Sequence, residues 1–149
     1  MLRNSLPILM ACALLTAGCG ELAGGTTVSG EVHNQEFDGF GGTAEQFGDS
    51  YTITIADDSG FDCFSTPSGD YLTIVIAGVD QTGSYSAVES VSFNSVSQGF
   101  QDTESATGGT VQIDRIDAED EPSPRIVGSI DAHGPTSDVS GDFSVRICS

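Results

Sequence analysis

Residues 51–55 read Tyr-Thr-Ile-Thr-Ile, and they give the clearest indication of the fold class. Its large apolar and its hydroxyl-bearing side chains alternate strictly, which is the pattern of a β-strand with one buried face. A turn signal, Asp-Asp-Ser-Gly, follows at residues 57–60. The most apolar candidate strand is Tyr-Leu-Thr-Ile-Val-Ile-Ala at residues 71–77, directly before Gly78. We therefore predict a β-sheet with residues 71–77 as its central strand.

The rest of the chain repeats this arrangement of short strands between turns. Residues 37–42 and 105–109 are predicted to be a glycine-rich loop and a turn. No long segment shows the spacing of apolar residues that indicates a helix. About eight or nine short strands predict an all-β domain, an antiparallel β-sandwich or a partly open barrel. The further candidate strands are residues 26–33, 83–88, 90–93, 109–113, 125–132 and 141–148.

Four glycines precede an apolar residue by two positions: Gly30, Gly109, Gly128 and Gly141. The motif is too short to indicate a true repeat. We expect these glycines at strand starts, where they provide the backbone freedom that tight turns need.

The chain is strongly acidic, with 22 Asp and Glu against four Lys and Arg and a net charge of −18. Three cationic side chains lie after residue 18, namely Arg115, Arg125 and Arg146. Nucleic acid is excluded as a partner because its binding needs many Lys and Arg contacts. For the same reason the composition excludes docking on anionic lipid head groups through a basic patch. The acids are spread along the chain, which favours a solvated coat over a cation-recruiting surface.

The N-terminus has the composition of an export signal. Arg3 precedes an uncharged apolar stretch at residues 6–15, which is too short to span a bilayer. The sequence Leu-Thr-Ala-Gly-Cys at residues 15–19 then resembles the lipobox of bacterial lipoproteins, with Thr16 as a mild departure. An ordinary secretory signal is the alternative, and it would leave Cys19 as a free thiol.

The lipobox resemblance implies cleavage before Cys19 and acylation of its thiol by chains of the palmitate type. The bilayer is then a partner through acylated Cys19, because two or three acyl chains anchor a protein stably. Gly20 follows the cysteine, and by resemblance to the sorting of enterobacterial lipoproteins this implies the outer rather than the inner membrane of the cell envelope. The predicted organisation is a signal-peptide helix at 1–18, a lipidated tether at 19–27 and a single domain at 28–149.

Two cysteines remain for the domain once Cys12 leaves with the signal peptide and Cys19 carries lipid. Cys63 and Cys148 form an even pair in an oxidising compartment, which predicts a disulfide. A cysteine-based metal site is the competing interpretation, but it needs further ligands at short spacing.

The last third of the chain resembles a pattern found in small exported lipoproteins. It contains Gly-Thr-Val-x-Ile at 109–113, Gly-Ser-Ile-x-Ala at 128–132 and a closing Gly-x-Phe-x-Val-x-x-Cys at 141–148. The resemblance implies a β-sandwich and a disulfide, and it implies no particular activity.

The sequence contains no recognisable catalytic motif. No Gly-x-Ser-x-Gly elbow accompanies His33 or His133, and no His-Glu-x-x-His is present. Asp57, Asp58 and Asp62 around a glycine are a weak Ca²⁺ candidate, because Ca²⁺ prefers oxygen ligands in flexible loops. We otherwise predict no metal and no cofactor.

These observations favour a lipid-anchored, non-catalytic envelope protein, a structural or binding module with an unspecified protein or glycan partner. The alternatives are a small envelope hydrolase that uses dispersed carboxylates and a Ca²⁺-binding envelope module.

Overall fold

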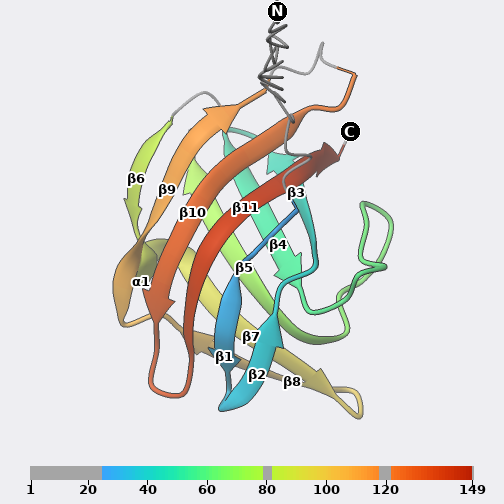
Figure 1. Ribbon diagram of the computed structural model, residues 1–149, viewed down its shortest axis with the longest axis vertical. Helices are drawn as coiled ribbons and strands as arrows, with labels where there is room; N and C mark the ends of the chain where they lie inside the picture. The colour runs from blue at the N-terminus through green and yellow to red at the C-terminus, as the bar shows by residue number, and fades with distance from the viewer. Residues whose placement is uncertain (1–24, 79–81, 118–121, 149) are drawn as a thin grey trace, which may run out of the picture.

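The computed structural model describes residues 25–78, 82–117 and 122–148, and its regular structure is almost entirely β-strand (Figure 1). The predicted signal-peptide helix at 1–18 lies outside the described residues. The one described helix is the single turn α1 (Ala87–Ser90). The strands are β1 (Ser29–Val32), β2 (Gln35–Asp38), β3 (Gly41–Phe47), β4 (Ser50–Ala56), β5 (Gly69–Ala77), β6 (Gly83–Ser86), β7 (Val91–Ser97), β8 (Phe100–Ser105), β9 (Gly108–Ile116), β10 (Arg125–His133) and β11 (Asp138–Cys148).

All of these strands belong to one curled sheet, so the predicted all-β fold is confirmed in its partly open barrel form (Figure 1). The order is β6-β9-β10-β11-β3-β4-β5-β7-β8, and β1 pairs with β11 and β2 beside this path. The pairings are antiparallel except that of β11 with β3, which is parallel. The start of β11 pairs with β1 and its end with β3, so two strands share one edge of β11.

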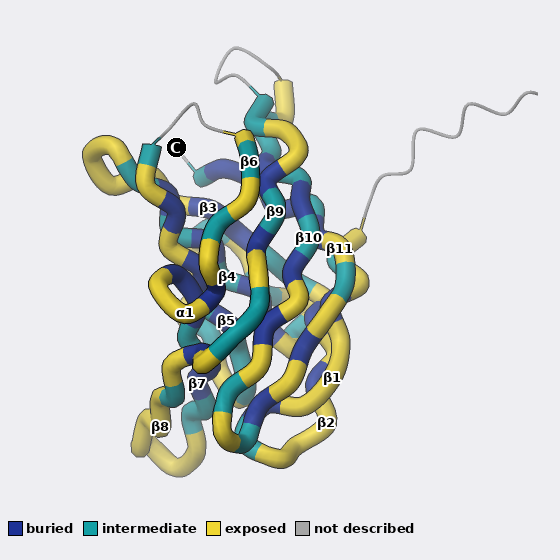
Figure 2. The backbone as a smooth tube through the Cα atoms, turned by 90° about the vertical axis from the view of Figure 1, so that its left-hand side faces the viewer, coloured by how far each residue is buried: buried dark blue, intermediate teal, exposed yellow. Residues whose placement is uncertain are grey.

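The core confirms the alternation that the sequence showed. Ile53 and Ile55 on β4 lie opposite Ile74 and Leu72 on β5, and all four side chains are fully buried. Strand β5 lies between β4 and β7, where Leu72 meets Phe93. Buried and exposed residues alternate along the strands in Figure 2, as expected for a sheet with one face on the core.

Some strand boundaries differ from those predicted. Residues 37–42 were expected to be a loop, but they contain the end of β2 and the start of β3, and β3 has no strongly apolar pattern to reveal it. The predicted short strand at 90–93 extends to Ser97 and continues after a tight turn as β8. Gln98 and Gly99 form that turn with positive φ values of 52° and 81°, which suits a two-residue hairpin.

The recurring glycines were expected at strand starts, but not all of them lie there. Gly128 and Gly141 lie inside β10 and β11. A Cβ at Gly109, Gly128 or Gly141 would come within 2.1, 2.2 or 2.4 Å, respectively, of a neighbouring backbone oxygen. These glycines are required because another chain segment passes against their Cα atoms.

No helix in the described part of the chain is long and apolar enough to cross a membrane.

Candidate functional site

The chain enters the barrel beside β11. The backbone N–H of Thr27 donates to the Asp142 carbonyl oxygen at 2.8 Å, and the Thr27 hydroxyl lies 3.3 Å from the Asp142 backbone N–H. Thr27 therefore extends the hydrogen-bonded pairing of β1 with β11 by two residues towards the N-terminus. Seven residues lie between Cys19 and Thr27, so the two residues can be at most about 28 Å apart.

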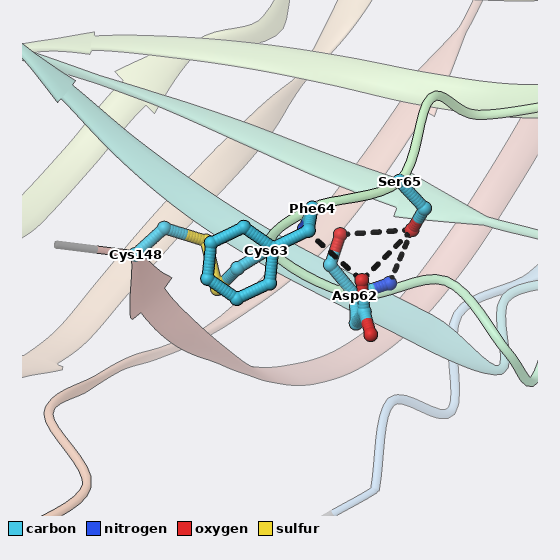
Figure 3. The surroundings of a disulfide bond; sticks show 5 residues. All are labelled: Asp62, Cys63, Phe64, Ser65 and Cys148. Carbon is cyan, nitrogen blue, oxygen red and sulfur yellow. Dashed lines mark hydrogen bonds between the residues drawn. A yellow bond between two sulfur atoms is a disulfide. The ribbon is translucent and has the colours of Figure 1, made fainter.

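The predicted disulfide joins Cys63 to Cys148, with their Cα atoms 5.5 Å apart (Figure 3). Cys148 is the last residue of β11, opposite Glu45 on β3. Its partner, Cys63, lies in the long loop between β4 and β5. The bond therefore ties this loop to the end of the last strand, and the predicted pairing is confirmed.

The proposed calcium ligands lie in the same loop, and two of them serve its turns. One oxygen of the Asp58 carboxylate accepts a hydrogen bond from the Gly60 N–H at 2.8 Å. The Asp62 carboxylate accepts from the Phe64 N–H at 3.0 Å and from the Ser65 hydroxyl at 3.2 Å (Figure 3). Within the described residues, no three His, Cys, Asp or Glu side chains are grouped so that they could hold a metal ion.

Asp57, the third of these carboxylates, lies among other negative charges. Partial burial raises its pKa from the ordinary 3.8, and the negative charges of Asp38, Asp70 and Asp58 raise it further. A raised folded-state pKa favours the protonated form, so this group contributes to stability at low pH and loses that contribution as the pH rises. Mutual repulsion between carboxylates therefore describes this side of the loop.

A second polar cluster, at the other end of the barrel, joins one strand to two turns. The Glu104 carboxylate on β8 accepts hydrogen bonds from both the backbone N–H, at 3.0 Å, and the hydroxyl of Thr136. His33, in the turn between β1 and β2, has its Nδ1 4.0 Å from Glu104 Oε2 and 3.8 Å from Asp102 Oδ2. The backbone N–H of His33 donates to the Ser137 hydroxyl at 3.1 Å. The cluster thus connects β8 to the β1–β2 and β10–β11 turns.

These contacts hold β8 against the two turns, and we call the cluster the clasp. Burial acts to raise the Glu104 pKa, but hydrogen bonds from Thr136 and Ser137 and the nearby His33 outweigh it and leave the pKa below its usual value of 4.5. Ser137 is only 4% exposed. Sequence reasoning did not find this cluster, because its members lie on separate turns and strands and are brought together only by the barrel.

We expect Glu104→Gln to lower the free energy of unfolding by about 1–2 kcal/mol at pH 7, since a charged acceptor of buried hydrogen bonds is lost. The lowered pKa means that the stabilisation is present above pH 4.5 and is lost as the pH falls through the folded-state value. Thermal unfolding of both proteins between pH 3 and pH 7 measures this difference. Asp102→Asn, at a side chain that is 80% exposed, is the control and should change little. A Glu104→Gln effect that does not depend on pH would contradict this explanation.

The fold gathers all three arginines of the described chain on one area of the outer surface, although the composition argued against a basic patch. Arg125 on β10 lies directly opposite Arg146 on β11. Arg115 on β9 lies opposite Val127, two residues along β10 from Arg125. We call these three residues the arginine patch. The three residues come from three adjacent strands, β9, β10 and β11, and Arg146 lies two residues before the end of β11.

Comparison with protein-family models, with curated proteins and with solved structures finds no match to this chain.

Proposed function

We infer that this protein is a lipid-anchored, non-catalytic component of the bacterial cell envelope. The observation that carries the proposal is the combination of a lipobox-like sequence ending at Cys19 with a disulfide in the folded domain. Disulfides persist in exported proteins and are rare in the cytosol. The disulfide therefore supports the same compartment that the lipobox indicates.

The short distance between the lipid and the fold supports a role at the membrane surface. With at most about 28 Å of chain between Cys19 and Thr27, the barrel remains close to the bilayer that holds the acyl chains. Gly20 after the cysteine favours the outer membrane as that bilayer. The domain would act there as a structural or binding module.

The polar clusters support a structural rather than a catalytic interpretation. Glu104 is held by Thr136, and its side chain is only 13% exposed. Asp58 and Asp62 accept hydrogen bonds from their own loop. A hydrolase with paired carboxylates needs two acids that flank an open substrate site, and these side chains are instead committed to turns and to the clasp.

The anchor is tested by expressing the precursor with a labelled fatty acid. Wild-type protein should take up the label, and Cys19→Ser should not, because the acyl-bearing group is transferred to a thiol. Cys12→Ser is the matched control, since it removes a thiol within the apolar stretch of the leader and should remain labelled. Label on the Cys19→Ser protein would contradict lipidation at this residue.

A further inference from the structure

The arginine patch concentrates the positive charge of a strongly acidic protein. After residue 18 the chain carries three Arg and 22 acids, a net charge of 3 − 22 = −19 from side chains. All three Arg side chains lie on the outer face of adjacent strands β9, β10 and β11. Like charges directly opposite each other, as at Arg125 and Arg146, destabilise a sheet, so this arrangement is not explained by strand pairing.

A β-bulge places the third arginine in the patch. Ile113 pairs with Gly128 and Arg115 pairs with Val127, so Asp114 is an extra residue in β9. If β9 were regular, with Asp114 paired with Val127, Arg115 would point to the same side as buried Ile113. The bulge redirects the side chain outward, where it is 63% exposed.

The guanidinium groups are only partly neutralised by the described residues. Arg115 Nε forms a salt bridge with Asp117 Oδ1 at 2.8 Å. Arg125 Nη1 donates to the carbonyl and hydroxyl oxygens of Ser144 at 3.3 and 3.2 Å, and both acceptors are uncharged. Arg146 is exposed and has no acid within salt-bridge distance among the residues that the structure describes.

The patch lies close to the point where the tether leaves the barrel. Thr27 is bonded to Asp142, four residues before Arg146 on the same strand, which is a distance of about 13 Å along β11. The tether from Thr27 to Cys19 is at most about twice as long as this distance. The patch is therefore within reach of any membrane that holds Cys19.

We propose that Arg115, Arg125 and Arg146 contact the phosphate groups of anionic lipids in the membrane to which Cys19 is attached. This proposal deepens the proposed function and rests on it. An anionic surface repels the acidic remainder of the protein, and the tether prevents the domain from leaving. The orientation of lowest electrostatic energy turns the arginine patch towards the lipid phosphates, and guanidinium groups bind phosphate in a bidentate manner. The patch thus sets which side of the barrel faces the membrane.

The test uses the chain from Cys19 onward, which contains every described element and has Cys19 as its only thiol outside the disulfide. Cys19 is coupled chemically to a maleimide lipid in vesicles of phosphatidylcholine, with or without phosphatidylglycerol. Phenylglyoxal then modifies arginine, and mass spectrometry measures the rate at each of the three residues of the patch. We expect Arg115 and Arg146 to react at least threefold more slowly on phosphatidylglycerol vesicles, and the protection to disappear in about 1 M salt, where the Debye length is near 3 Å.

The matched control carries Cys19→Ser with Ser97→Cys, which moves the attachment point to the β7–β8 turn. This turn lies at the end of the barrel opposite the arginine patch (Figure 1). We expect equal rates on both vesicle types from this attachment. Equal rates from Cys19, or equal protection from both attachment points, would overturn the proposal. Protection by inorganic phosphate alone on phosphatidylcholine vesicles would show a free-anion site instead of a lipid contact and would also overturn it.

Failure here is distinguishable from failure of the proposed function. The coupling to Cys19 is chemical and needs no lipidation in the cell. The fatty-acid label on Cys19→Ser tests the anchor without reference to the arginines.

Discussion

Replacing both Cys63 and Cys148 with Ser is expected to lower the free energy of unfolding by about 4 kcal/mol. The disulfide closes a loop of 85 residues, and the cross-link removes that much loop entropy from the unfolded chain in the entropic account. It also holds the end of β11 against β3, where strand pairing spans only Arg146 to Cys148. Urea unfolding of the two proteins, both beginning at Gly20, gives the difference directly.

The loss should be largest at low ionic strength. The net charge opposes the compact state, and salt screens this repulsion. The melting temperature of the reduced or double-Ser protein should therefore rise more steeply with salt than that of the oxidised protein. A change below about 1 kcal/mol would mean that the sheet holds β11 without the cross-link.

Gly109→Ala is expected to have the second large effect, a loss of roughly 3 kcal/mol or more. Its Cβ would lie 2.1 Å from the carbonyl oxygen of Asp131 and 2.7 Å from the Cα of Ala132. Both of these are backbone atoms of β10, so the two strands would have to separate. The φ of Gly109 is also +109°, which an L-residue rarely adopts.

Gly99→Ala separates the two causes. Gly99 has a φ of +81°, but nothing lies within 4 Å of its Cβ position. It should therefore show the conformational penalty alone, about 1–2 kcal/mol. Chemical denaturation of both variants measures the difference, and equal losses would contradict the close approach of β9 and β10 at Gly109.

The sequence predicted those strands in which buried and exposed positions alternate from one residue to the next. The alternation at residues 51–55 and the apolar run at 71–77 predicted β4 and β5, because burial of one sheet face leaves a period of two. The predicted central position of β5 was wrong, since β5 is the third strand from the β8 edge of the sheet. The disulfide was predictable because only two cysteines remained to pair. Strand β3 was not predicted, since its side chains lack a clear apolar alternation.

Features that depend on which distant strands pair, and in which register, could not be predicted from the sequence. The end of β11 can pair in parallel with β3 because β1 pairs only with the start of β11. No local sequence pattern indicates this arrangement. The arginine patch depends on a bulge at Asp114 and on the pairing of Arg125 with Arg146. The clasp at Glu104 unites residues about 30 and 70 positions apart, and the sequence alone does not bring them together. For the same reason the four recurring glycines were assigned to turns, although close backbone contacts explain all four of them.

The central claim is that the protein is exported and attached to a membrane through Cys19. The most direct measurement is mass spectrometry of the protein purified from the envelope of cells that express the full chain. We expect an N-terminal peptide that begins at Cys19 and carries a diacylglyceryl group, together with a linked pair of peptides that contain Cys63 and Cys148. A protein that retains residues 1–18, or one whose N-terminal Cys19 carries no lipid, would contradict this claim.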